Sequence, residues 1–239
     1  MLSLQGSIGA LNDITDREAD ARSKPQKPLP AGAVGASVAR AIVVGGLLLG
    51  LFISAAIGVG PLVVAVLGVG IGYLYDLRLK GTGWAWLPFA VGVPLLPIYA
   101  WVGADAPLPS AFAVLVPAAI AAGAALALGN QLADLARDRV SGTQSTARRL
   151  GRSGAWAVMA GLHAGVAVLA LFSLGPLGGR GPGIAVAVAG TACLAIGTVL
   201  ARASGTRSHE RAWETQAAGV GILAAGWLAA IADGGSLAS

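Results

Sequence analysis

The feature that most constrains this chain is the alternation of long uncharged segments with short charged ones. No Asp, Glu, Lys or Arg occurs in residues 41–75, 81–104, 106–133, 153–179, 181–201 and 215–232. A membrane-spanning helix needs about 20 predominantly apolar residues. The first segment is long enough for two spans separated at residues 58–61, and each of the other five holds one. We therefore predict seven full transmembrane helices.

Composition supports the bilayer as the solvent of this chain. Hydrophobic residues make up 56% of the sequence and charged residues 11%, and the mean hydropathy is +0.75. Soluble domains usually carry about 25% charged residues. The 36 glycines suit closely packed membrane helices, in which small residues let the backbones approach. The predicted fold class is all-α, a polytopic membrane helix bundle.

The basic residues are confined to alternate loops. Four such regions carry nearly all the positive charge, and the loops between them have only Arg180. By the positive-inside rule these basic loops face the cytoplasm, which predicts an integral protein of the cell membrane. The net charge of +5 follows from this topology and from contact with anionic lipid. No basic stripe is interleaved with aromatic residues, so we expect no nucleic-acid partner.

The N-terminal segment predicts only part of a helix. Residues 2–11 are mostly apolar, but a helix from Met1 to Asn12 rises only about 16 Å, against a hydrocarbon core of roughly 30 Å. We therefore expect a start upstream of Met1 and a partial N-terminal helix in addition to the seven full ones.

Two acidic motifs share one spacing. The first has Asn12, Asp16 and Asp20, with Asp13 beside them, and the second has Asn130, Asp134 and Asp138. Residues i, i+4 and i+8 lie along one face of an α-helix, so each motif predicts an acidic stripe. The repetition predicts a single domain, 1–239, made of two related halves, about 1–110 and 111–239.

Carboxylates at a membrane boundary require a compensating partner. A carboxylate in the bilayer costs about 2.5–3.5 kcal/mol on insertion scales. Mg²⁺ binds carboxylate oxygens and often shares its remaining positions with a substrate phosphate. We predict Mg²⁺ ligands at Asp13, Asp16, Asp20, Asp134 and Asp138, with Asp13, Asp16, Asp134 and Asp138 as catalytic candidates. The alternative, plain solvated loop charge, is weakened by the two copies in one register.

These motifs resemble the signatures of the UbiA superfamily of membrane prenyltransferases. Asn12-Asp13-x-x-Asp16-x-x-x-Asp20 is similar to the first signature, and Asp134-x-x-x-Asp138 to the second. The basic, proline-rich segment 24–32 and the segment 73–80 also resemble parts of that family. The resemblance implies a fold of nine transmembrane helices, of which this sequence lacks the first and part of the second.

Further residues are candidates for substrate binding. They are Asn12, Asn130, Lys24, Lys27, Tyr75, Arg78 and Lys80. The amides can bind a metal or a phosphate without adding charge, and the cations can bind a diphosphate. The alternative for the basic residues is topogenic charge, and for Tyr75 it is the interfacial aromatic belt. His163 lies alone within an apolar segment, and we interpret it as structural.

The resemblance implies a Mg²⁺-dependent enzyme, a transferase. It would move the prenyl group of a polyprenyl diphosphate donor to an unidentified acceptor, aromatic or a lipid precursor, within the membrane. Ionisation of the donor would give an allylic cation that the acceptor captures. Alternatives from the sequence are a terpenoid cyclase of the same family and a non-catalytic membrane transport or binding protein.

Overall fold

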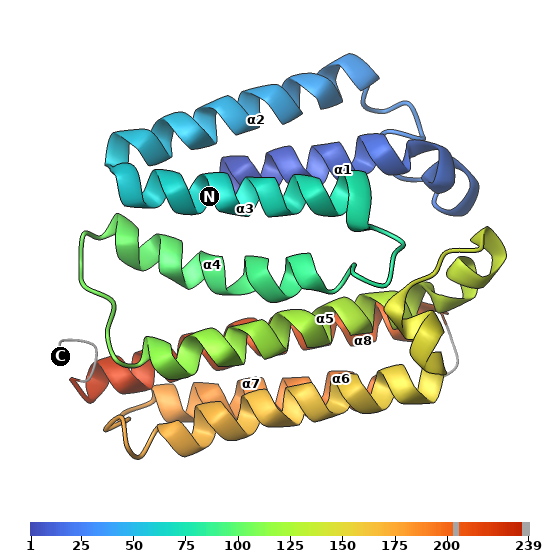
Figure 1. Cartoon of the computed structure of the whole chain (residues 1–239). Helices are drawn as coiled ribbons and strands as arrows, with labels where there is room; N and C mark the ends of the chain where they lie inside the picture. The colour runs from blue at the N-terminus through green and yellow to red at the C-terminus, as the bar shows by residue number, and fades with distance from the viewer. Residues whose placement is uncertain (203–205, 236–239) are drawn as a thin grey trace. The chain divides into compact units, whose positions relative to one another are not determined.

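The computed structural model describes residues 1–202 and 206–235, without the side chains of residues 23, 137, 139–141, 206–208 and 210. These ranges form helices joined by turns and contain no strand, which confirms the all-α prediction (Figure 1). The helices are α1 (Leu2–Ser23), α2 (Ala36–Ile57), α3 (Val59–Leu74), α4 (Leu87–Gly103), α5 (Phe112–Ser141), α6 (Thr146–Ser173), α7 (Gly183–Leu200) and α8 (Thr206–Asp233). A π-helical turn, η1 (Tyr75–Leu79), continues α3.

Six of the described helices are long and apolar enough to cross a membrane, namely α2, α3 with η1, α5, α6, α7 and α8. The structure differs from the prediction of seven full spans at residues 81–104. There α4 has only 17 residues, because residues 81–86 form turns that begin at Gly81, whose φ is +75°. At 1.5 Å per residue, such a helix rises about 26 Å.

The exposed apolar side chains fit a lipid environment. On α2, Leu48 is 63% exposed and Phe52 is 73% exposed. Contiguous apolar surface of this kind is unfavourable in water, and in a bilayer it faces lipid chains instead. The helix bundle is therefore that of an integral membrane protein.

The chain divides into two compact units. The N-terminal unit consists of Met1–Lys80 and Leu95–Pro107, and the C-terminal unit consists of Gly81–Pro94 and Leu108–Ser239. Helix α4 contributes its first half to the C-terminal unit and its second half to the N-terminal unit. Each unit is described by itself below.

In the N-terminal unit, α1 packs against both α2 and α3 (Figure 1). A Cβ atom at Gly46 would lie 2.6 Å from the Ser3 carbonyl oxygen, and one at Gly72 would lie 2.6 Å from Ile8 Cδ1. A larger residue at Gly46 would collide with the backbone of α1, and one at Gly72 would require the Ile8 side chain to move. The three helices are thus held at a defined separation.

Hydrogen bonds of Ser7 join the same three helices. The Ser7 hydroxyl donates to the Val43 carbonyl at 2.6 Å and lies 2.7 Å from the Tyr73 hydroxyl. Because the only proton of Ser7 goes to Val43, Tyr73 is the donor in the second bond. These bonds fix the position of α1 along α2 and α3, and with it the position of the residues that follow on this helix.

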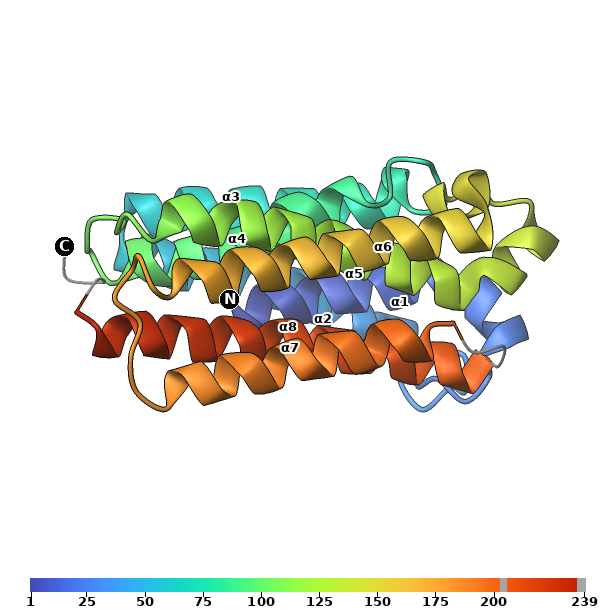
Figure 2. The same ribbon diagram turned by 90° about the horizontal axis from the view of Figure 1, so that it is seen from below.

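In the C-terminal unit, α5 pairs with α6, and α7 lies along α8 (Figures 1 and 2). A Cβ atom at Gly190 of α7 would collide with the backbone of Leu223 on α8, so these helices pack backbone to backbone. His163 of α6 is buried and pairs through Nδ1 with the Thr198 hydroxyl at 3.0 Å. This contact is consistent with the structural interpretation of the histidine.

Candidate functional site

The first acidic motif lies on the last three turns of α1. The helix ends after Ser23, where the Lys24 backbone amide donates to the Asp20 carbonyl at 2.7 Å. Pro25 follows, and the residue before a proline is disfavoured in the helical conformation. The whole motif is therefore helical, and its side chains project from successive turns of one rigid element.

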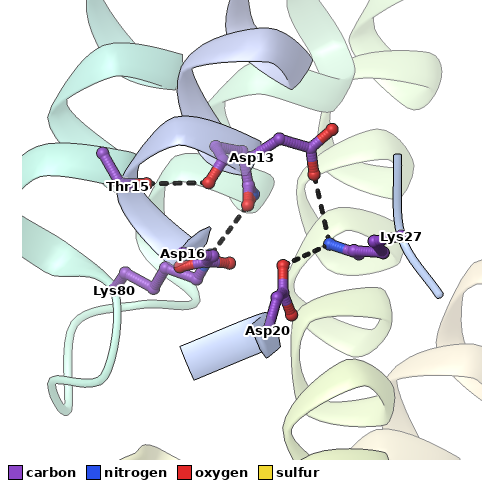
Figure 3. A network of polar contacts seen from close by, with 7 residues as sticks. Asp13, Thr15, Asp16, Asp20, Lys27 and Lys80 are labelled. Atoms are coloured by element: carbon purple, nitrogen blue, oxygen red, sulfur yellow. Dashed lines mark hydrogen bonds and ion pairs between the residues drawn. The ribbon is translucent and has the colours of Figure 1, made fainter. Parts of the chain in front are cut away.

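Lys27 bridges two carboxylates of this motif. Its ammonium group donates to Asp20 Oδ2 at 2.7 Å and to Asp13 Oδ1 at 3.1 Å (Figure 3). Asp13 and Asp20 are seven residues apart, which is two turns of a helix, so both carboxylates lie on the side of α1 that faces Lys27. The loop that follows α1 thus brings the Lys27 ammonium group back to the acidic side chains of this helix.

The two partners of Lys27 differ in burial. The side chain of Asp20 is 8% exposed, whereas that of Asp13 is 46% exposed. Burial on its own would lower the pKa of Lys27. The hydrogen bonds to Asp20 and Asp13 and the charges of both carboxylates outweigh burial and raise the pKa above the ordinary lysine value. Lys27 is therefore a permanent cation at physiological pH.

Lys80 bridges the other two residues of the motif. Its ammonium group donates to Asn12 Oδ1 at 2.9 Å and forms an ion pair with Asp16 (Figure 3). Lys80 follows the π-helical turn η1, whose wide ring is closed by the Lys80 backbone amide and the Tyr75 carbonyl at 2.9 Å. The Lys80 ammonium also lies 5.9 Å from the centre of the Tyr75 ring, within the range of a cation–π contact.

The other predicted cations of this unit are placed differently. Arg78 is exposed and makes no hydrogen bond or ion pair with the motif within the described part of the chain. Lys24 contributes its backbone amide to the end of α1. Lys27 and Lys80 are the candidate cations whose ammonium groups contact side chains of the motif as described above.

The donor set of the first motif fits a divalent cation. Each lysine ammonium is held by two oxygen atoms of the motif, which shows that these oxygens converge in pairs on a positive charge. Carboxylate and amide oxygens are also the ligands that Mg²⁺ prefers. Among the described side chains, no group of three or more His, Cys, Asp or Glu residues is arranged as a metal site. Mg²⁺ bound here would share these carboxylates with the two lysines.

The second acidic motif lies at the end of α5, in the C-terminal unit. Asn130, Asp134 and Asp138 are each half-buried, and the hydroxyl of Ser145 donates to Asp138 Oδ2 at 2.6 Å. Helix α5 ends at Gly142, whose φ of +76° lies in the left-handed region that glycine adopts without strain. The chain then turns back, so that Ser145 at the start of α6 faces the end of α5.

Further hydrogen bonds hold this turn. Gln131 Oε1 accepts the Ala147 backbone amide at 3.0 Å, and Arg148 donates to the Thr143 carbonyl at 2.8 Å. Arg148 also donates to the Asp138 carbonyl at 3.3 Å. Arg148 thus stabilises the end of α5 and the turn that follows it.

Two polar residues near the motifs were not predicted as part of a site. Ser145 is buried and bonds to Asp138, and its place one residue before α6, typical of a helix-capping serine, was the available signal. Asp76 is buried in η1, and its position directly after the uncharged segment 41–75 was a signal as well. Neither signal reveals which side chains these residues face.

The chain matches one protein family over almost its whole length. The UbiA prenyltransferase family matches residues 1–231. Two curated relatives, both named digeranylgeranylglyceryl phosphate synthase, are similar over a shorter segment. The one from Methanopyrus kandleri is 38% identical over 73 residues, and the one from Ignicoccus hospitalis is 39% identical over 74 residues. These matches span 30% and 31% of this chain, but only 27% and 24% of the relatives.

Solved structures share the fold. The apo structure of a UbiA homologue from Aeropyrum pernix K1 aligns with a TM-score of 0.71 and 21% identity, over 95% of this chain and 85% of that one. A UbiA homologue from Archaeoglobus fulgidus bound to DMAPP and Mg²⁺ aligns with a TM-score of 0.67 and 19% identity, over 93% of this chain and 84% of that one. The resemblance and the fold class predicted from the sequence are confirmed. The chain is a member of the UbiA prenyltransferase family.

Proposed function

We propose that this chain transfers the prenyl group of a polyprenyl diphosphate, in the presence of Mg²⁺, to an acceptor within the membrane. The observation that carries the proposal is the pairing of oxygens in the first motif around two ammonium groups. A stripe that binds cations in this way suits a metal–diphosphate complex better than solvated loop charge does. The solved Archaeoglobus homologues bound to Mg²⁺ with DMAPP or GPP support the same donor class.

Both acidic motifs supply candidate Mg²⁺ ligands. Asp13, Asp16 and Asp20 of α1 and Asp134 and Asp138 of α5 would hold Mg²⁺. The bound metal would supply Lewis-acid stabilisation of the charge that grows on the departing diphosphate. The carboxylates orient the complex, and the amides of the two motifs can bind metal or phosphate oxygens without adding negative charge.

The two bridging lysines have a second role in this proposal. With Mg²⁺ held by the carboxylates, the ammonium groups of Lys27 and Lys80 would be available to bind diphosphate oxygens. Their side chains are 32% and 31% exposed, so a ligand from solution can reach them. Pro25 and Pro28 restrict the loop that carries Lys27, which lowers the entropic cost of placing its charge.

The apolar helices would accommodate the rest of the substrate. A long prenyl chain stays in the bilayer because apolar surface is expelled from water. The basic loops predict that the diphosphate binds at the cytoplasmic face of the cell membrane. Because the curated relatives are named for a glyceryl phosphate product, a lipid-precursor acceptor is the first to test, followed by aromatic acceptors.

Diphosphate release from geranylgeranyl diphosphate tests this function. The full chain in membranes would be assayed with and without Mg²⁺, beside Asp16→Asn and Asp134→Asn. Glu18→Gln is the matched control, because it removes an equal charge from an exposed position on α1. We expect release that needs Mg²⁺ and an acceptor, that both aspartate variants lose, and that the control keeps.

Two other outcomes distinguish the alternatives. Release without any added acceptor, accompanied by a cyclised or hydroxylated product, would indicate a terpenoid cyclase. Absence of both release and Mg²⁺-dependent donor binding, across several donor lengths and an acceptor mixture, would contradict the enzyme proposal. The chain would then be a non-catalytic member of its family.

A further inference from the structure

Asp76 is a buried carboxylate without a hydrogen-bond partner. It lies in η1, its residue is 7% exposed, and neither carboxylate oxygen accepts a hydrogen bond from any residue that the structure describes. Buried polar groups in proteins are nearly always hydrogen-bonded, and a buried charge without a partner is especially unfavourable. The position of Asp76 therefore requires an explanation beyond packing.

The charged neighbours of Asp76 belong to the first acidic motif and its lysine. The turn η1, which carries Asp76, packs against α1, the helix that carries Asp16. Lys80 follows four residues later, at the end of the same π-helical turn. The Lys80 ammonium group nevertheless pairs with Asp16 and donates to Asn12. Lys80 thus has two carboxylates nearby and bonds to only one.

Mg²⁺ would compete with Lys80 for Asp16. A carboxylate oxygen that binds Mg²⁺ is no longer available to an ammonium group on equal terms, because the two cations repel each other. Lys80 must then move toward a different anion. Asp76 lies on the turn that leads to Lys80, and both of its carboxylate oxygens are without a hydrogen bond from any described residue, so it can accept the ammonium group.

We propose that Asp76 is a positioning residue that receives the Lys80 ammonium group when Mg²⁺ takes Asp16. The carboxylate at Asp76 keeps Lys80 charged and close to the acidic motif, where the ammonium group can also bind a diphosphate oxygen. Asp76 itself touches neither metal nor substrate, and it acts through Lys80. This inference rests on the proposed function, because it requires Mg²⁺ to bind the first motif.

A Mg²⁺ titration of four proteins tests the inference. The purified full chain, Asp76→Asn, Lys80→Met and the double variant would be titrated with Mg²⁺ while thermal unfolding is followed. Binding of geranylgeranyl thiodiphosphate, a slowly reacting donor analogue, would be measured in the same series. Glu18→Gln again controls for the loss of one negative charge near the motif.

We expect the effect of Asp76→Asn on the Mg²⁺ titration to depend on whether Lys80 is present. In the wild-type background, Asp76→Asn leaves Lys80 on Asp16, so the half-saturating Mg²⁺ concentration rises by about tenfold, which is within the coupling seen for residues in contact. In the Lys80→Met background, the same substitution changes it by less than about twofold, because no lysine remains to be received. Without Mg²⁺, Asp76→Asn melts at or above the wild-type temperature, since it removes an unpartnered buried charge.

Other outcomes overturn the inference. An equal effect of Asp76→Asn in both backgrounds would make Asp76 a direct metal ligand. No effect in the wild-type background would leave Asp76 without a role in the site. An Asp76→Asn protein that fails to fold, or melts below wild type without Mg²⁺, would show a structural carboxylate. If wild type itself shows no response to Mg²⁺, the proposed function fails together with the inference, whereas the other three results leave that function intact.

Discussion

Replacing Lys27 by methionine removes the ammonium group that joins Asp13 to Asp20 and keeps the apolar stem of the side chain. Asp20 then loses its 2.7 Å partner while its side chain stays 8% exposed. Leaving a buried acceptor unpaired costs about 1–3 kcal/mol, and more for a charged one. The contact with Asp13 is half-exposed, so its loss adds only about 0–1 kcal/mol.

Water reduces the cost of this substitution. Because the Lys27 side chain is 32% exposed, solvent screens the pair, and we expect a net loss of about 1–2 kcal/mol in the free energy of unfolding. For a chain of this size, that corresponds to a fall of roughly 2–8 °C in Tm. The assay is thermal unfolding of the purified protein in detergent, with Arg22→Met as a control that removes an exposed cation from the same helix end.

The dependence of Tm on Mg²⁺ and on pH gives two further tests of this prediction. Mg²⁺ supplies a replacement cation, so it should raise the Tm of Lys27→Met more than the Tm of wild type. The folded pKa of Lys27 is raised, so its contribution is fully present below the ordinary lysine pKa of about 10.4 and is lost as the pH rises through the higher folded value. The difference in Tm should therefore be constant from about pH 6 to about pH 9. Equal melting of Lys27→Met and Arg22→Met would refute the reasoning.

Three further substitutions give defined outcomes. Gly72→Ala should cost about 1–3 kcal/mol of stability and weaken Mg²⁺-dependent donor binding, because the new methyl group meets Ile8. Both losses should be smaller in the double variant with Ile8→Ala. Thermal melting and donor-binding assays measure the two effects. Ser145→Ala should cost about 1–2 kcal/mol, measured by melting, because Asp138 loses a 2.6 Å hydrogen bond. Tyr73→Phe should cost about 1 kcal/mol by removing the donor to Ser7, with an unchanged half-saturating Mg²⁺ concentration in the same titration.

Most of the helical architecture could be predicted from the sequence, because uncharged segments of spanning length have few alternatives to transmembrane helices. The exception is residues 81–104. There the absence of charge indicated a full span, but Gly81 begins a turn and the helix starts only at Leu87. Hydropathy measures how apolar a segment is and not where its backbone turns, so glycine conformation decided this boundary.

The residue types of the site were also predictable, whereas their pairings were not. Periodicity placed Asn12, Asp16 and Asp20 on one face of a helix. The structure divides the motif differently, since one lysine joins Asn12 to Asp16 and the other joins Asp13 to Asp20. Each pairing depends on a chain reversal that brings a distant cation to the helix, and helical spacing contains no information about that reversal.

The burial of Asp76 could not be predicted from the sequence, for a related reason. An acidic residue at the end of an apolar segment is typical of a charge at the membrane interface. Asp76 is buried in the π-helical turn η1, which packs against α1 and α3. Such contacts depend on tertiary packing and become visible only in the folded chain.

The central claim is that both acidic motifs take part in Mg²⁺-dependent binding of the prenyl diphosphate donor. The most direct test is the affinity for radiolabelled geranylgeranyl diphosphate at increasing Mg²⁺ concentration, compared among wild type, Asp16→Asn, Asp134→Asn and the double variant. We expect each single substitution to weaken Mg²⁺-dependent binding by at least about tenfold, because each removes a carboxylate that would hold the metal, and the double variant to bind no more tightly than either single variant. Wild-type affinity in either single variant would contradict the claim.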